Sequence, residues 1–185
     1  EMCIRDSTTA MVNLYRQRYE HYGHGAADQA IVGLGGQVFA AETEKKAKEI
    51  FRPYFDNAPV YGHGPSLEEF ENITPLTVGT PEQIIERYLG YADAVGDYQR
   101  QLFLIDHAGL PLEMALEQVE ILGTEIVPVL REEFERRRPA HVPSDPPTHA
   151  SLVAEGADSP HLLVRPAERN PVSYTHLTLP TTPYV

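Results

Sequence analysis

Apolar side chains recur every three or four residues in four stretches of the chain, which predicts four helices. The first helix covers Thr8–Gly23, and the second runs from its capping residue Thr43 to about Phe55. The third runs from Thr80 to Val95, because Thr80, Pro81 and Gln83 form a capping box with proline at the first helical position. The fourth follows Pro111 for about 25 residues, with Pro128 expected to kink it. Its apolar seam consists of Leu112, Leu116, Val119, Leu122, Ile126 and Leu130.

Two shorter apolar stretches have no helical period and predict buried strands, at about residues 30–41 and 101–106. Glycines of the sequence Gly-Leu-Gly-Gly lie inside the first strand. They indicate a bulge or close packing there, because a dinucleotide-binding loop would need glycines between a strand and a helix. Residues 56–76 are rich in proline and glycine and predict a long loop of the kind that forms lids, with at most a short turn at Leu67–Phe70.

The elements alternate between helices and strands, which is typical of an α/β protein with parallel strands and right-handed crossovers. Helices make up most of its predicted structure. Two parallel strands cannot cover their own faces and edges. The pattern therefore predicts the closing units of a larger α/β structure.

Composition changes along the chain and suggests where the folded part ends. Nine of the 16 prolines lie from Pro139 onward, and residues 139–171 have no apolar periodicity, so we expect a disordered tail. The segments 1–7 (EMCIRDS) and 172–185 resemble translated sequencing-adapter sequence, and we expect them not to belong to the fold. Residues 8–138 are then the expected domain, and we expect the chain to be a fragment of a longer protein.

Charge and hydropathy limit the classes of partner that the chain is expected to bind. The chain has 15 Lys and Arg against 27 Asp and Glu, a net charge of −12. That balance argues against binding to nucleic acid or to an anionic membrane surface. No apolar run approaches the roughly 18 residues that span a bilayer. We therefore expect neither a nucleic-acid nor a membrane partner, and a cytoplasmic location.

Several motifs occur in an order that resembles the C-terminal part of the luciferase-like flavin monooxygenases. They include Leu14-Tyr-Arg, Phe39-Ala-Ala-Glu-Thr with Ala47, and Leu102–Gly109. The most specific are Val78-Gly-Thr-Pro-Glu-Gln-Ile84 and Leu122-Gly-Thr-Glu-Ile-Val-Pro128. The similarity covers about residues 9–138.

The resemblance implies a (β/α)8 TIM barrel of which this chain holds the last two strand–helix units. Residues 30–41 would be strand seven, residues 101–106 strand eight, and residues 56–77 a variable insertion near the barrel mouth. It also implies an oxidoreductase that uses reduced flavin (FMN) and dioxygen to oxidise a small organic substrate, with a homodimer as the expected assembly. A deazaflavin-dependent hydride-transfer enzyme of the same fold is the first alternative. The main flavin-phosphate contacts would come from strands five and six, so the chain alone is expected to be inactive.

Asp106 and His107 are the candidate catalytic residues, because active sites of such barrels lie at the carboxyl ends of the strands. Asp106 could orient a substrate or a flavin-bound peroxide, or simply cap the turn before the last helix. His107 could act as an acid or base near neutral pH. Adjacent strand residues point to opposite sides, so both face one pocket only if the strand has already ended.

The sequence raises two further questions, whether the chain holds a metal site and whether it is an enzyme at all. His21 and His24 lie three residues apart, but no third ligand accompanies them, and we expect no metal site. The chain could also be an acidic interaction module without catalysis. Two strands with unpaired edges would be a liability in such a module.

Overall fold

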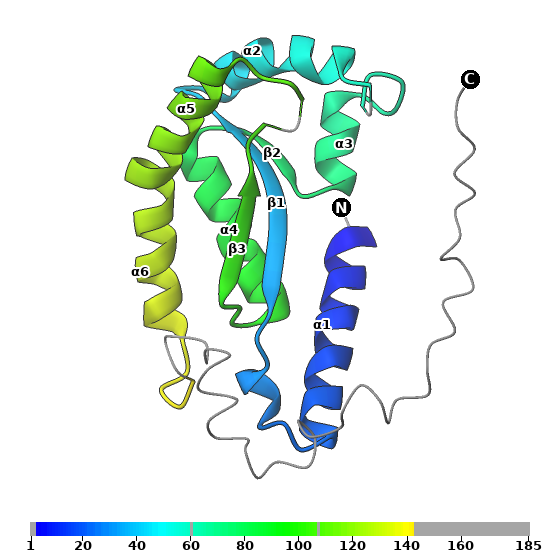
Figure 1. Ribbon diagram of the computed structural model, residues 1–185, viewed down its shortest axis with the longest axis vertical. Coiled ribbons are helices and arrows are strands. Elements are labelled where there is room, and N and C mark those ends of the chain that lie inside the picture. Colours follow the sequence, from blue (N-terminus) through cyan, green and yellow to red (C-terminus); the bar gives the residue numbers. More distant parts are fainter. Residues whose placement is uncertain (1–2, 60, 107, 143–185) are drawn as a thin grey trace, which may run out of the picture. The chain divides into compact units, whose positions relative to one another are not determined.

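The computed structural model describes the backbone of residues 3–59, 61–106 and 108–142, which lie in one compact unit, Glu1–Asp145. Residues 143–171 of the expected tail and the second adapter-like segment fall outside these residues, as does His107. The first four residues of that tail are described, and Val142 is buried, so the start of the predicted disorder is wrong. The coarser fold prediction is confirmed: the described chain is mostly helical, and its sheet is parallel (Figure 1). In chain order the elements are α1 (Cys3–His21), η1 (Ala27–Gln29), β1 (Gly33–Ala40), α2 (Glu44–Asn57), α3 (Leu67–Ile73), β2 (Leu76–Gly79), α4 (Pro81–Val95), β3 (Arg100–Leu104), α5 (Leu112–Ile121), the π-helical segment η2 (Leu122–Ile126) and α6 (Val127–Arg137).

The sheet has three strands in the order β2-β1-β3. β1 pairs with β3 over Gly33–Gln37 and with β2 over Gln37–Ala40. The predicted long loop is therefore partly wrong, because α3 and the start of β2 lie within it. β2 is only four residues long and follows Pro75 directly, so it has too little alternation to be recognised in a sequence.

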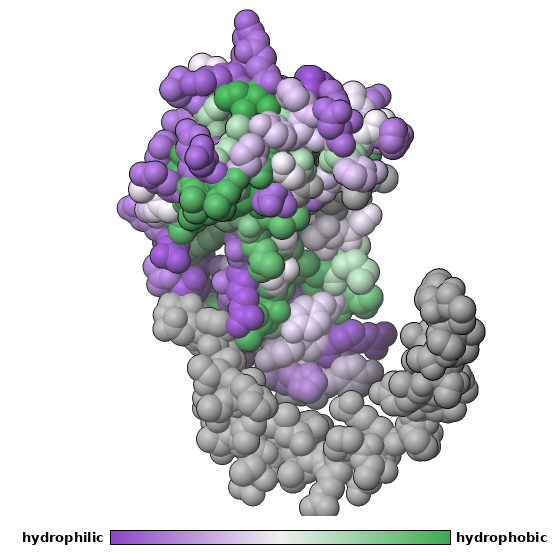
Figure 2. All heavy atoms as spheres, turned by 45° about the horizontal axis from the view of Figure 1, so that its top comes forward, coloured by the Kyte–Doolittle hydropathy of each residue, from purple (hydrophilic) through white to green (hydrophobic). Residues whose placement is uncertain are grey.

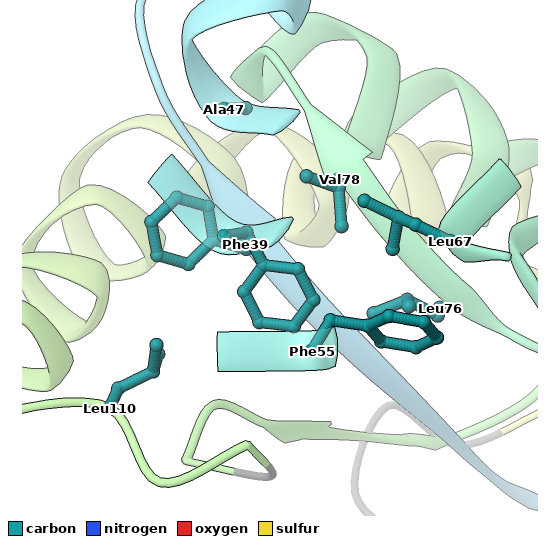
Figure 3. Packing of buried hydrophobic residues seen from close by; sticks show 8 residues of the cluster. Phe39, Ala47, Phe55, Leu67, Leu76, Val78 and Leu110 are labelled. Atoms are coloured by element: carbon teal, nitrogen blue, oxygen red, sulfur yellow. The ribbon is translucent and has the colours of Figure 1, made fainter. Parts of the chain in front are cut away.

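One face of the sheet is covered near the carboxyl ends of β1 and β2. Phe39 and Val78 are opposite one another in the register and point to this face. α2 lies over them, and the phenyl rings of Phe39 and Phe51 have centroids 5.2 Å apart. The buried cluster, of which Figure 3 labels seven members, consists of Phe39, Ala47, Phe51, Phe55, Leu67, Leu76, Val78 and Leu110.

The other face is covered by α4 and the last helix. Val38 and Ala40 point to this face because side chains alternate along a strand. Tyr88 of α4 lies against Gly36, where any Cβ would be 1.8 Å from the tyrosine oxygen. The expectation that these glycines mark close packing is confirmed at Gly36. The buried members of the cluster are Val38, Ala40, Ile84, Tyr88, Leu122, Ile126 and Leu130.

α1 extends this second face. Val12 of α1 packs with Val32, Val95 and Tyr98, and Leu34 of β1 borders the cluster. Met11, Leu14, Tyr15 and Tyr22, which the spacing of three and four residues places on one face of the helix, are exposed.

β3 is covered on one face only. Phe103 and Ile105 pack toward α4 and the last helix, whereas Leu102 and Leu104 are 65% and 50% exposed. The prediction of a strand buried on both faces is therefore wrong within the described residues. Leu112, Leu116 and Val119 of α5 are also exposed, so only the second half of the predicted seam packs on the sheet. Figure 2 shows hydrophobic side chains gathered at the surface of the molecule among polar ones. No helix in the described ranges is both long and apolar enough to cross a membrane.

Candidate functional site

The carboxyl ends of β1 and β3 meet at one edge of the sheet because the strands are parallel. Leu104 is opposite Gln37, so residues 38–40 of β1 continue past the last paired residue of β3. Asp106 follows two residues after β3 ends. The structure thus brings Phe39–Ala41 and Ile105–Asp106 to the same edge, which is where an active site was expected.

Asp106 has an exposed side chain at this edge. Its Oδ1 accepts a hydrogen bond from the backbone N–H of Leu110 at 2.9 Å, just before α5 begins. The turn-capping role considered from the sequence is therefore present. This bond occupies one carboxylate oxygen, and the catalytic role stays a prediction. His107, the other candidate, lies outside the described residues.

Gln118 of α5 is a buried polar residue at this edge, and the sequence analysis missed it. Its Oε1 accepts a hydrogen bond from the backbone N–H of Ala40 at 2.6 Å, and its Nε2 donates to the carbonyl of Ala40 at 3.0 Å. β3 has ended at this level of the sheet, so the amide takes the place of a neighbouring peptide. The sequence does contain one indication of this burial. Gln118 precedes Leu122 by four residues and therefore lies on the same inward-facing side of the helix.

A second group of polar residues lines the free edge of β2. Glu71 is 9% exposed, and its Oε1 accepts a hydrogen bond from the backbone N–H of Val78 at 2.8 Å. Its Oε2 lies 3.3 Å from Nζ of Lys48, which is also 2.7 Å from Oε1 of Glu44. Burial opposes the charge of Lys48, but the bonds to Glu44 and Glu71 outweigh it and raise the pKa of the ammonium group. The ion pairs therefore hold α2 and α3 against the strand edge.

A hollow of about 360 Å³ lies beside this edge, lined in part by Lys48, Glu71, Thr77 and Arg87. The hydroxyl of Thr77 is buried and has no hydrogen-bond partner in the described part of the chain. Arg87 is held in place because its Nη2 donates to the carbonyls of Glu71 and Thr74. Glu71, which bonds Val78 and Lys48, and Glu44, which bonds Lys48, both serve existing contacts, so the arrangement fits protection of a strand edge better than catalysis.

A larger hollow, of about 1120 Å³, runs along α4 and the last helix. Ile85, Leu89 and Val129 contribute its apolar lining, and Glu86 and Glu125 are among its acidic residues. Its lining also includes Asp93 and Arg137, which form an ion pair with Oδ1 and Nη1 2.8 Å apart. Within the described ranges, no three histidine, cysteine or acidic side chains are grouped so that they could hold a metal ion.

Fold and site together define a mixed α/β protein with a small parallel sheet and a polar carboxyl edge. A scan against protein-family models and a search of curated proteins found no match to this chain.

Proposed function

We propose that this chain is the C-terminal part of a flavin-dependent oxidoreductase of the luciferase-like class, with β1 and β3 as the seventh and eighth strands of a (β/α)8 barrel. The intact protein would oxidise a small organic substrate with reduced flavin and dioxygen. The order of motifs described above is the sequence support. The structural support is the arrangement of helices around β1 and β3.

One observation carries the proposal: α1 before these two strands, α4 between them and α6 after them pack on the same face. α1, α4 and α6 all contribute to the clusters behind Leu34 and Val38. In a barrel every helix lies outside the strands, so this face would be the outer one. α2 and α3 cover the opposite face only near the carboxyl ends, where β2 pairs with Gln37–Ala40 of β1. This matches an insertion at the mouth of a barrel.

The opposite face of β1 and β3 is suited to the interior of such a barrel. Leu102 lies opposite Gly35, and Leu104 lies opposite Gln37. Both leucines are open to solvent, and a Cβ on Gly35 would meet nothing within 4 Å. Missing strands would cover this apolar surface.

The described residues fit only the ring part of a flavin. Leu104, at the carboxyl end of β3, is an exposed apolar side chain that a planar ring could contact. Residues 39–41 and 104–106 include no cation for the phosphate, which must then be held by residues elsewhere in the intact protein. A bound flavin would supply the redox chemistry. Asp106 would orient the substrate with the carboxylate oxygen that Leu110 does not use.

The test begins with the coding DNA on both sides of this sequence. Further strand–helix units upstream would allow the whole enzyme to be expressed and assayed for substrate oxidation with reduced FMN and dioxygen. Activity with a reduced deazaflavin and no dioxygen would select the alternative. In the whole enzyme, Asp106→Asn should lower kcat at least tenfold with little change in Tm, whereas Glu113→Gln, also exposed, should change neither. Absence of upstream units, or full activity of Asp106→Asn, would contradict the proposal or the role of Asp106 respectively.

A further inference from the structure

α4 and the last helix lie side by side on one face of the sheet, and the hollow of about 1120 Å³ runs along them (Figure 1). Ile85 and Leu89 of α4 and Val129 of α6 line it, and each of these apolar side chains is at least partly exposed. The part of α4 that borders the hollow, Glu82–Asp93, is about 17 Å long at 1.5 Å per residue. That length accommodates about three turns of another helix.

The charges around the hollow are mainly negative. Its lining contains five acidic residues against two arginines. Arg137 is already paired with Asp93, and Arg87 donates to two backbone carbonyls. Glu86 of α4 and Glu125 of η2 are exposed, and no ion pair joins either of them to another residue that the structure describes. An apolar strip is therefore accompanied by carboxylates that can still accept a cation.

We propose that this hollow is the docking site for a basic amphipathic helix of a partner protein. Apolar side chains of that helix would cover Ile85, Leu89 and Val129. Lysine or arginine side chains beside them would pair with Glu86 and Glu125, which lie on different elements. A small cation would leave the apolar strip in water, and a wholly apolar helix would leave the carboxylates without partners. Glu125 also belongs to a π-helical turn, a feature that is frequent at functional sites.

This inference goes beyond the proposed function and is compatible with it. In a barrel the helices lie outside the strands, so the hollow along α4 and α6 would stay at the surface of the intact protein. The docked helix would occupy neither a strand edge nor the carboxyl ends of β1 and β3. Docking is measured without any cofactor, so failure of one proposal leaves the other standing.

The first measurement is the fluorescence anisotropy of a labelled synthetic helix of about four turns, titrated with the full chain. The peptide carries leucines along one face and lysines on both sides of them. A second peptide has glutamate in place of lysine, and a third distributes the same residues so that the leucines no longer share a face. We expect saturable binding of the first peptide, weakened by added salt. The other two should bind at least tenfold more weakly.

Two double charge reversals show where the peptide binds. Glu86→Lys combined with Glu125→Lys should raise its Kd at least tenfold, because two attractive contacts become repulsive. Glu113→Lys combined with Glu117→Lys is the matched control. Both glutamates are exposed on α5, outside the lining of the hollow but next to exposed leucines. This control should change the Kd less than about twofold, because salt screens distant charges.

A pair of valine substitutions tests the apolar contact separately. Val129→Gln should raise the Kd about threefold, because the docked helix would bury this side chain. Val119→Gln, on α5, should not, although the two valines have similar exposed fractions of 43% and 53%. All these side chains are exposed, so the Tm of each variant should stay close to that of the unmodified chain.

Three results would overturn the proposal. The first is no saturable binding of the lysine peptide. The second is equal binding of all three peptides, which would show attraction without a defined site. The third is a reversal at Glu113 and Glu117 that weakens binding as much as the reversal at Glu86 and Glu125, which would place the peptide on α5 instead.

Discussion

Gly36 shows how a single residue sets the distance between the sheet and α4. An added Cβ would lie 1.8 Å from Oη of Tyr88, whose side chain is fully buried. We expect Gly36→Ala to lower the free energy of unfolding by about 1–3 kcal/mol, because the ring must move within a packed core. Chemical denaturation would measure the loss.

The neighbouring glycine is the matched control for this prediction. A Cβ on Gly35 would meet nothing within 4 Å, so Gly35→Ala should have little effect. Combining Gly36→Ala with Tyr88→Phe should recover part of the stability, because it removes the tyrosine oxygen, the atom closest to the added Cβ. Recovery should be incomplete, since two ring carbons still lie within 3.0 Å of that Cβ. Equal effects of the two alanine substitutions would show that Tyr88 does not pack on Gly36.

Gln118 is the polar residue on which the carboxyl edge most depends. Its amide makes two hydrogen bonds with the backbone of Ala40, and both partners are buried. Gln118→Ala should cost about 2–4 kcal/mol of stability, because it leaves a buried N–H and a buried carbonyl unpaired. Thermal or urea unfolding would measure this cost. Glu117→Ala, on the adjacent exposed position, should cost little; a similar loss in both variants would point to helix propensity instead.

Asp106 and Gln118 illustrate what the sequence reveals about the site. Asp106 could be placed because it follows an apolar strand, and the carboxyl end of a strand is fixed by local pattern. Gln118 reaches Ala40 across 78 residues of chain. No local pattern encodes such a contact, although its inward position on the helix could have been noticed.

At the scale of elements, the sequence predicts correctly those features that neighbouring residues stabilise, such as helix caps. The capping box at Thr80 is confirmed, with Oγ1 of Thr80 accepting from the backbone N–H of Gln83 at 3.3 Å. Thr43 caps α2 as expected. β2 and the exposed face of α1 were missed, because each depends on which distant segments pack against it.

The last helix departs from the prediction in a specific way. The backbone N–H of Val127 donates to the carbonyl of Leu122, five residues back, so the helix widens just before Pro128. Such a wide turn accommodates the residue that lacks an N–H and was expected to cause a kink. Leu122 and Ile126 stay buried, whereas Leu112 and Leu116 do not. Apolar residues recur with the same period in both halves of the last helix, so the period cannot show which half packs against the rest of the chain.

Gly123 lies in this wide turn, and a Cβ there would meet nothing within 4 Å. Gly123→Ala should therefore raise the free energy of unfolding by about 0.5–1 kcal/mol, since alanine restricts the unfolded chain more than glycine does. Equilibrium denaturation would show a sign opposite to that of Gly36→Ala. Destabilisation would mean that another part of the protein packs on Gly123.

α2 and α3 are joined by an ion pair that should respond to acid. Arg52 bonds both carboxylate oxygens of Glu68, and these bonds lower the pKa of Glu68 below its ordinary value. A lowered folded-state pKa adds stability above the unfolded-state pKa, and this stability is lost as the pH falls through the folded-state pKa. Because the pair is exposed, we expect only a small effect. Glu68→Gln should slightly flatten the fall of Tm below about pH 5, whereas the same change at exposed Glu86 should not.

At the scale of the whole molecule, the chain builds a core on both sides of its sheet yet leaves several large apolar side chains in water. Leu112 and Leu116 of α5 are 73% and 57% exposed. They follow one another on the same stripe of the helix. Exposed apolar stripes of this kind favour association, and in the proposed barrel they would lie against the missing units.

Replacing both leucines distinguishes a chain in which they remain exposed from a whole enzyme in which they are buried. In the 185-residue chain, Leu112→Gln with Leu116→Gln should leave Tm nearly unchanged and increase the soluble fraction, because side chains that remain exposed add little to folding. The matched variant Leu130→Gln should unfold the chain, since Leu130 is only 3% exposed. In a whole enzyme of the proposed class, the paired substitutions should instead lower Tm clearly, because the same leucines would be buried. A large loss of Tm in the chain itself would mean that these leucines already have a partner there, and an unchanged Tm in the whole enzyme would argue against a barrel that closes over α5.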